Sequence, residues 1–123
     1  MVTTIKKSKT GNPYSCPLTA AVDKIGGRWK PIILFYLSNG SRRFGQLAVT
    51  VPMISKKVLT QQLKQLEVDG LISREQFNEI PPRVEYTLTD FGKSVLPILD
   101  SICEWGKQLA QEKPLQQEEM KYN

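Results

Sequence analysis

The sequence predicts a mainly α-helical domain that carries one small β-hairpin. Three observations support this α+β fold class. Between Thr19 and Asp69, apolar residues recur at three- and four-residue spacing, as in helices that pack on a core. After Gly70 the pattern changes to the alternation that is typical of strands, and it becomes helical again after Leu88. A length of 123 residues and an apolar content of 40% fit one folded domain.

The first part of the chain predicts four helices. A short helix over residues 19–25 is followed by an almost entirely apolar helix over residues 29–37. The third helix, over residues 42–49, ends before Pro52, because the residue before a proline is driven out of helical geometry. The fourth helix covers residues 55–69 and follows after a tight connection.

The fourth helix is amphipathic. Ser55 can cap it, and Gly70 stops it. Its buried face consists of Leu59, Leu63 and Leu66. Its opposite, polar face consists of Lys57, Thr60, Gln61 and Lys64, with Lys56 at the edge. No acidic residue occurs from Ser55 to Leu66, whereas a generic surface helix mixes Glu with Lys for pairing four residues apart.

The second part of the chain predicts two strands and a long helix. The strands cover residues 71–77 and 83–88, and residues 78–82 form the tip of the hairpin. Thr89 can cap a terminal helix that continues toward Leu109. Pro97 lies within this helix and predicts a kink or a lost hydrogen bond.

The predicted organisation is one domain with two short extensions. We expect a flexible arm over residues 1–13, the domain over residues 14–111 and a frayed tail over residues 112–123. The longest apolar run, residues 31–37, is far shorter than the roughly 20 residues that cross a bilayer. Because the polar, basic N-terminus is followed by no apolar stretch, we expect a cytoplasmic protein without membrane contact.

The charge of the chain is unevenly distributed. The formal net charge is +5, and it is made up of about +5 over residues 1–41, +4 over residues 42–74 and −4 over residues 75–123. Such segregation suits an anionic polymer, because phosphates are drawn to the cationic face. The same modest net charge is equally compatible with a role in solubility alone.

The residue types argue against a metal centre and against catalysis. The chain has no histidine, and its two cysteines, Cys16 and Cys103, show no metal-ligand spacing. Histidine is also the commonest general base, and the sequence contains no glycine-rich phosphate loop and no nucleophile elbow. We therefore expect neither a cofactor nor an enzymatic activity.

The order of the predicted elements is that of a winged helix-turn-helix. In this arrangement the second helix of the pair, here residues 55–69, enters the major groove of DNA. Gln61 can bind adenine through two hydrogen bonds, Lys57 and Lys64 can donate to guanine or phosphate, and the Thr60 methyl can contact a thymine methyl. A polar helix face is more often simply solvated, but its place in this element order favours DNA recognition.

Three arginines are further candidates for DNA contact. Arg42 and Arg43, at the start of the third helix, can hold a backbone phosphate, or they are ordinary loop charges. Arg83 follows Pro81-Pro82 at the hairpin tip. We favour a contact of Arg83 with DNA, either in a minor groove or on a phosphate. The alternative is an ion pair of Arg83 with Glu85 or Glu79.

The sequence resembles the HxlR-type family of bacterial winged helix-turn-helix transcription regulators, a relative of the MarR type. The resemblance covers about residues 14–110. It is carried by Cys16-Pro17, the run Ile25-Gly26-Gly27-Arg28-Trp29-Lys30, Arg43-Phe44, Leu59-Thr60-Gln61-Gln62-Leu63, Leu66-Glu67 with Asp69-Gly70-Leu71, and the run from Pro81-Pro82-Arg83 through Val84-Glu85-Tyr86-Thr87-Leu88-Thr89. Each motif alone is weak, but their order and spacing together are specific.

The resemblance implies a homodimer that binds a pseudo-palindromic operator, with the terminal helix and the N-terminal helix forming the dimer interface. The terminal helix is independently rich in apolar residues. The expected interface residues are Val95, Leu99, Ile102, Trp105 and Leu109. The alternative is that this stripe closes the core of the protomer itself.

The resemblance also implies a role for Cys16. Some members of the family sense electrophiles or disulfide stress through a cysteine directly before the proline at this position, and Cys16 matches it. Lys24, Arg28 or Lys30 can lower the pKa of its thiol if the fold brings one of them close. Against this, free cysteines are often buried as small apolar residues. Cys103 is interpreted as a residue of the interface or of the core packing.

Other functions are compatible with this fold. A winged helix can instead bind nucleic acid without sequence preference or bind a protein partner. A small-molecule or electrophile effector is a further possibility, because a group of aromatic residues can line a ligand pocket. The more common role of such residues is packing in the core. These residues are Trp29, Phe35, Tyr36 and Trp105.

Overall fold

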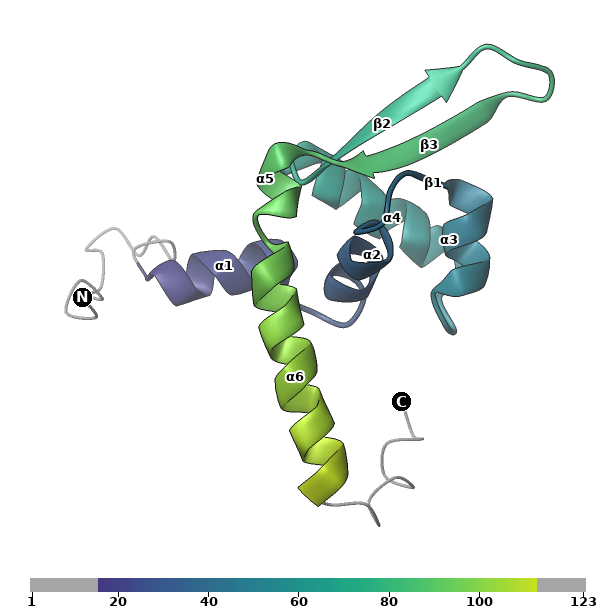
Figure 1. The fold of residues 1–123 in the computed structure, drawn as a ribbon. Helices are drawn as coiled ribbons and strands as arrows, with labels where there is room; N and C mark the ends of the chain where they lie inside the picture. The colour runs from purple at the N-terminus through teal and green to yellow at the C-terminus, as the bar shows by residue number, and fades with distance from the viewer. Residues whose placement is uncertain (1–15, 113–123) are drawn as a thin grey trace.

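The structure, a computed structural model, describes residues 16–112 (Figure 1). These residues confirm the predicted fold class, since helices dominate and a small antiparallel sheet accompanies them. The predicted arm over residues 1–13 and residues 113–123 of the predicted tail lie outside the described residues. Residue 112, which was expected in the tail, is the last residue of the terminal helix.

The four predicted N-terminal helices are confirmed. They are α1 (Pro17–Ile25), α2 (Lys30–Tyr36), α3 (Phe44–Thr50) and α4 (Lys56–Val68). Helix α1 begins two residues earlier than predicted, because proline suits the first helical position, where no backbone N–H is needed.

The structure corrects the interpretation of Arg42 and Arg43. These residues do not begin a helix but form a short strand, β1 (Arg42–Arg43). Arg42 pairs with Tyr86 and Arg43 pairs with Glu85. A strand of two residues shows no periodicity, so its pairing with a distant segment could not be recognised from the local sequence.

Helix α4 has the predicted ends. The Ser55 hydroxyl oxygen accepts a hydrogen bond from the backbone N–H of Val58 at 3.1 Å. At the other end Gly70 has a φ of 79°, a left-handed conformation that glycine adopts without steric cost. The backbone N–H of Leu71 then donates to the Leu66 carbonyl at 3.0 Å, as in a Schellman motif. Both ends of the helix are therefore fixed by local contacts.

The predicted hairpin is confirmed as β2 (Ile72–Phe77) and β3 (Arg83–Leu88). Their register runs from Ile72 opposite Leu88 to Phe77 opposite Arg83. Strand β3 lies in the middle of the sheet, in the order β1-β3-β2. In Figure 1 the hairpin reaches away from the helices, and its tip, residues 78–82, is its most distant part.

The prediction of one long terminal helix is wrong. The segment forms two helices, α5 (Asp90–Lys93) and α6 (Leu96–Glu112), with a break between them. The predicted cap is confirmed, because the Thr89 hydroxyl accepts a hydrogen bond from the Gly92 N–H at 3.0 Å. Pro97 is the second residue of α6, where a missing N–H costs no hydrogen bond, so the helix begins there instead of being kinked.

Helix α5 is held tightly against the turn that follows α4. The Thr89 hydroxyl donates to the Gly70 carbonyl at 2.6 Å, and the Thr89 N–H donates to the Leu71 carbonyl at 3.1 Å. Gly92 is buried where α5 crosses the Leu71 carbonyl, and a Cβ atom at Gly92 would overlap with the Leu71 oxygen. Glycine is therefore the residue that this crossing accommodates.

The core lies between α2, α3, α4, the sheet and the beginning of α6. It includes the three leucines predicted for the buried face of α4. Its largest fully buried side chains are Ile33, Leu34, Leu37, Leu47, Leu59, Leu63, Leu66, Leu71, Ile72 and Val51. Helix α1 contributes no fully buried residue and projects from this body, as Figure 1 shows.

Candidate nucleic-acid interface

The polar face of α4 is exposed, as predicted. Lys56, Lys57, Thr60, Gln61 and Lys64 are all solvent-accessible. None of the three lysines forms an ion pair with another residue of the described range 16–112. Their charges are therefore available to an external anion.

Two hydroxyl groups on this helix also serve the helix itself. Ser55 uses its oxygen as the cap acceptor and keeps its O–H for an outside acceptor such as phosphate. Thr60 donates its hydroxyl hydrogen to the Lys56 carbonyl at 2.8 Å. The exposed part of Thr60 is thus suited to an apolar contact through its methyl group.

The arginines of β1 lie beside the start of α3. One Arg42 guanidinium nitrogen donates to the Ser41 carbonyl at 3.1 Å, and this side chain is half-buried. The backbone N–H of Arg43 donates to the Gln46 side-chain oxygen at 2.8 Å, which caps α3. The Arg43 guanidinium is exposed, and its Nε lies 4.0 Å from a Glu85 carboxylate oxygen.

For Arg83 the structure favours the ion-pair alternative over the DNA contact that we preferred. Its guanidinium donates to Glu85 at 3.1 Å and to Glu79 at 2.8 Å. It also stacks on the Phe77 ring, with 3.9 Å between its Cζ atom and the ring centroid. The side chain is 24% exposed and its Nε is buried without a hydrogen-bond partner in the described chain. The two neighbouring carboxylates make the approach of a phosphate to Arg83 unfavourable, although each terminal guanidinium nitrogen keeps a second N–H.

A group of cations beside α4 was not predicted as part of the interface. Lys24, Lys30 and Lys64 line a depression of about 430 Å³, which Asp23 and Asp69 also line. The Lys24 ammonium group lies 3.2 Å from an Asp69 carboxylate oxygen, so the C-terminal end of α1 is tied to the end of α4. Lys30 extends the cationic surface of α4 toward α2. The early basic segment of the sequence was the signal for this surface, but the fold was needed to place it.

Cys16 stands at the N-cap of α1 and is half-buried. Hydrogen bonding from the Thr19 side chain, and then from the Thr19 and Leu18 backbone N–H groups, lowers the pKa of its thiol. Hydrogen-bond donors stabilise a charged thiolate more than a neutral thiol, so these groups favour the thiolate. Lys24, Arg28 and Lys30, the candidate cations from the sequence, are not among the causes of the lowered pKa.

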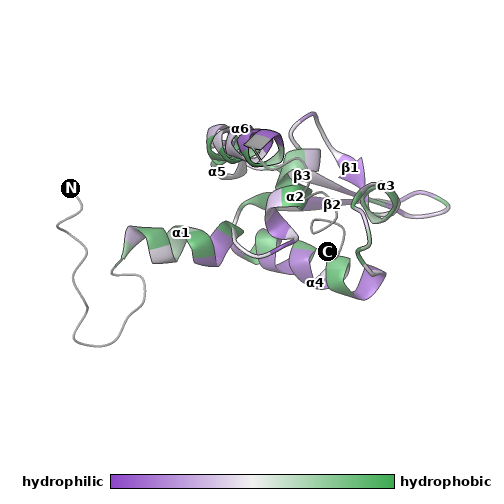
Figure 2. Ribbon diagram, turned by 90° about the horizontal axis from the view of Figure 1, so that it is seen from below, coloured by the Kyte–Doolittle hydropathy of each residue, from purple (hydrophilic) through white to green (hydrophobic). Residues whose placement is uncertain are grey.

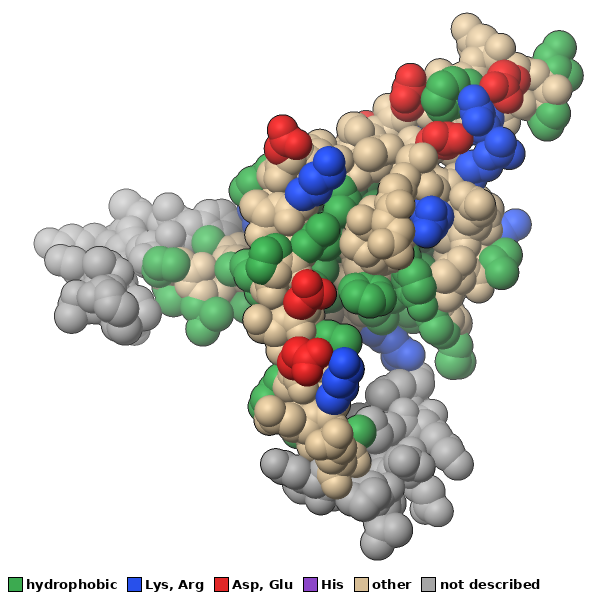
Figure 3. Space-filling model, viewed as in Figure 1, with side chains coloured by type: hydrophobic (Ala, Val, Ile, Leu, Met, Phe, Trp, Pro, Cys, Tyr) green, Lys and Arg blue, Asp and Glu red, His purple; other side chains and the backbone are tan. Residues whose placement is uncertain are grey.

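The expected interface residues of α6 fall into two groups. Val95 and Leu99 are buried in the core of the single protomer, as the alternative interpretation proposed. Ile102, Trp105 and Leu109 remain 52%, 61% and 44% exposed. Leu18 and Val22 of α1 are also exposed. Figure 2 shows hydrophobic residues along both helices, and Figure 3 shows apolar side chains at the surface of both. Exposed apolar side chains on two helices mark a candidate interaction surface.

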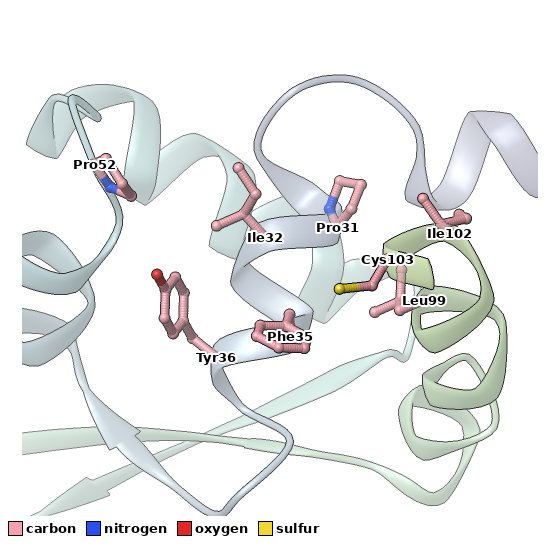
Figure 4. Close-up of a pocket in the computed structure, with 8 residues that line it drawn as sticks. All are labelled: Pro31, Ile32, Phe35, Tyr36, Pro52, Leu99, Ile102 and Cys103. Atoms are coloured by element: carbon pink, nitrogen blue, oxygen red, sulfur yellow. The ribbon is translucent and has the colours of Figure 1, made fainter. Parts of the chain in front are cut away.

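The four aromatic candidates do not gather in one pocket. Phe35 and Tyr36 lie edge to face, with 6.0 Å between their ring centroids, and both line an apolar depression between α2 and α6. Trp29 instead packs against the core. Trp105 is exposed on α6 and lies outside this depression. Cys103, interpreted as a residue of the interface or of the core packing, is exposed and lines the depression (Figure 4), so it is not part of the core of the single protomer.

A two-helix unit with an exposed cationic second helix, followed by an antiparallel wing, defines a winged-helix DNA-binding protein. The chain belongs to the HxlR family of transcription regulators, because the family model described as HxlR-like helix-turn-helix matches residues 24–114. It is 51% identical over 94 residues to an HTH-type transcriptional regulator of Methanothermobacter thermautotrophicus, and this match covers 76% of the chain and 72% of the relative. The protein is thus a DNA-binding transcription regulator.

Solved structures agree with this assignment. The HTH-type regulator YtcD of Bacillus subtilis superimposes with a TM-score of 0.74 at 42% identity, covering 76% of this chain and 96% of that one. The redox regulator HypR in its oxidised form gives a TM-score of 0.73 at 41% identity with the same coverage. No helix within residues 16–112 has the length and apolar character that a membrane span requires.

Proposed function

We propose that the protein is a cytoplasmic, non-enzymatic homodimer that binds a pseudo-palindromic operator and places α4 of each protomer in a major groove. The observation that carries this proposal is the exposed face of α4, with three lysines that have no ion-pair partner among the described residues. The absence of acidic residues from Ser55 to Leu66 keeps this face attractive to phosphate and to base edges.

The apolar surface of α6 and α1 supports the dimer. Ile102, Trp105 and Leu109 follow one another at three- and four-residue steps, so they form one stripe. A stripe that includes an exposed tryptophan is typical of a protein–protein interface. A twofold-symmetric pairing through this stripe would present two α4 helices to DNA.

Selection of bound duplexes from a random DNA pool tests the proposal. The protein is purified under reducing conditions and used at near-physiological salt. We expect enrichment of an inverted repeat with half-sites about one helical turn, ~34 Å, apart. A steep salt dependence without enrichment would instead indicate nonspecific binding, and no DNA affinity at all would indicate a protein partner.

Removal of the Gln61 amide should weaken the recognition of one base pair. Gln61→Ala is expected to cost roughly 1–3 kcal/mol of specific binding, because two hydrogen bonds to an adenine are lost. Fluorescence anisotropy with the selected duplex and with single-base variants measures this. Gln111→Ala is the matched control, since this exposed glutamine lies on α6 and not on α4. Unchanged discrimination in the Gln61 variant would remove Gln61 from the reading residues.

Removal of the Arg42 charge should act differently. Arg42→Ala is expected to weaken the selected and the unrelated duplexes by similar factors, and to reduce the slope of log K against log salt by about one. The reason is that a phosphate contact carries no sequence information. A loss confined to the selected duplex would contradict this role.

A second candidate function is redox sensing through Cys16. It is favoured by the lowered pKa of the thiol and by the likeness to a redox regulator. Because the thiolate is the reactive form, diamide should release the wild-type protein and Cys103→Ser from the operator, whereas Cys16→Ser should stay bound. Gel-shift assays before and after reduction measure this. Release of Cys16→Ser by diamide would exclude this role for Cys16.

A further inference from the structure

We propose that Lys30 and Lys64 together bind a phosphate group of the DNA backbone in the depression between α1, α2 and α4, outside the contacts with bases. This space, called the lysine depression below, has a volume of about 430 Å³. It is lined by Asp23, Lys24, Lys30, Lys64, Gln65, Val68 and Asp69. The proposal deepens the function proposed above and rests on its DNA-binding part.

Two of the three lysines in the depression have no partner among the described residues. Neither Lys30 nor Lys64 forms an ion pair or a side-chain hydrogen bond within residues 16–112. Lys30 is half-buried, so part of its hydration is lost and the oxygens of an anion would replace it. The two lysines come from different helices, α2 and α4, so one anion in the depression can contact both.

The acidic residues of the depression are already balanced by Lys24. Its ammonium group lies 3.2 Å from an Asp69 carboxylate oxygen and 3.8 Å from an Asp23 carboxylate oxygen. Three lysines and two aspartates leave the depression with a net charge of +1. An anion is therefore the ligand that this charge favours, and it meets Lys30 and Lys64 as the available cations.

Lys64 joins the depression to the polar face of α4. Lys57, Gln61 and Lys64 lie on one face of the helix, because they are four and three residues apart. Base contacts come from the N-terminal part of a recognition helix, and Lys64 lies about 12 Å further along the axis than Lys56. The major groove is itself about 12 Å wide. Lys64 therefore lies near the margin of the groove, where the backbone phosphates run.

The lysine depression is separate from the proposed dimer surface. Lys30 and Lys64 belong to α2 and α4, which do not carry the apolar stripe. On α1, Lys24 follows Val22 by two residues, so it lies on a different side of the helix from Leu18 and Val22. Its ion pair with Asp69 turns that side toward α4, and Figure 2 shows the end of α1 beside α4. A dimer formed through Leu18 and Val22 therefore leaves the depression open to DNA.

A phosphate within a polymer suits this site better than a free ion. Lys64 is exposed to solvent, so its attraction to a small free anion is weakened by water and salt. A backbone phosphate is instead kept nearby by the other contacts of α4, which gives it a high effective concentration. The DNA backbone is for this reason the occupant that we assign to the depression.

Salt titration of Lys30→Gln, with the full chain and both the selected and an unrelated duplex, tests the proposal. Loss of one phosphate contact should reduce the slope of log K against log salt by about 0.9 per protomer. At 0.1 M salt this corresponds to roughly eightfold weaker binding per protomer. The conservative variant Lys30→Arg keeps the charge and should retain the contact. Lys93→Gln is the matched control, because this exposed lysine of α5 does not line the depression.

Duplexes that carry one neutral methylphosphonate group locate the contact. We expect one position in each half-site where this group weakens the wild type and Gln61→Ala but has no effect on Lys30→Gln, which already lacks the contact. Circular dichroism of Lys30→Gln checks that the variant is folded. Identical methylphosphonate profiles for the wild type and folded Lys30→Gln, or equal salt slopes, would overturn the proposal.

The same titrations separate this proposal from the function on which it rests. Enrichment of an inverted repeat with an unchanged slope for Lys30→Gln would leave the proposed function standing and overturn the phosphate contact. A reduced slope with equal affinity for all sequences would support the contact and contradict sequence-specific recognition. Titration with inorganic phosphate in the absence of DNA covers the remaining source of the anion. Tight, saturable binding that Lys30→Gln abolishes would assign the depression to a free anion and overturn its assignment to DNA.

Discussion

Replacing Trp105 and Leu109 with glutamate should convert the dimer to a monomer that binds the inverted repeat only weakly. The single protomer leaves both side chains exposed, so the change should hardly affect its folding. In a dimer, two carboxylates per chain would be buried among apolar groups. Loss of one tryptophan anchor typically costs 2–4 kcal/mol of association, which is roughly 30- to 1,000-fold in Kd.

Sedimentation equilibrium and operator titration measure the two consequences together. Gln111→Glu is the control, because this residue lies six positions after Trp105 and therefore off the stripe. It should leave both the oligomeric state and the operator affinity unchanged. A Trp105/Leu109 double variant that remains dimeric would show that the interface lies elsewhere.

Gly92→Ala is expected to destabilise the domain by about 1–3 kcal/mol, or more if the backbone cannot move. The added Cβ overlaps with the Leu71 carbonyl oxygen, and this oxygen already accepts the Thr89 N–H. Relief of the overlap requires α5 to move away from the turn after α4. For a domain of this size the melting temperature should fall by roughly 5–20 °C.

Thermal unfolding followed by circular dichroism measures this change. Gly45→Ala serves as the control, since no atom of the described chain lies within 4 Å of a Cβ at that position and this exposed residue lies on α3, away from the proposed dimer interface. It should be neutral or should stabilise α3 by about 0.5–1 kcal/mol, because alanine is the better helix former. Equal melting temperatures for Gly92→Ala and the wild type would mean that the crossing of α5 is not tightly packed.

The helices and the hairpin were predictable because their signals are local. The leucine spacing of α4, the cap at Ser55 and the stop at Gly70 each depend on neighbouring residues, and all three are confirmed. The alternation of Val84, Tyr86 and Leu88 likewise identified β3. Periodicity and capping are sufficient for such elements.

The remaining features depend on contacts between distant residues. Strand β1 is defined by its pairing with β3, some forty positions away, and the position of α5 by the packing of Gly92 on Leu71. The partners of Arg83 are close in sequence but were recognised only as an alternative, because the sequence does not show whether this side chain faces Glu79 and Glu85 or an external phosphate. The predicted exposure of the polar face of α4 is confirmed. Its contacts with bases remain a prediction.

The attachment of α1 has a mechanical consequence. Its C-terminal end is held by the Lys24–Asp69 ion pair and by Ile25 against the core, while its other end carries Cys16. A helix of nine residues is about 13 Å long. Helix α1 is therefore attached at its C-terminal end, beside the end of α4, while Cys16 lies at its other end. Asp69 is the C-cap residue of α4, so a force on the cysteine end of α1 would reach the end of the proposed reading helix through this ion pair.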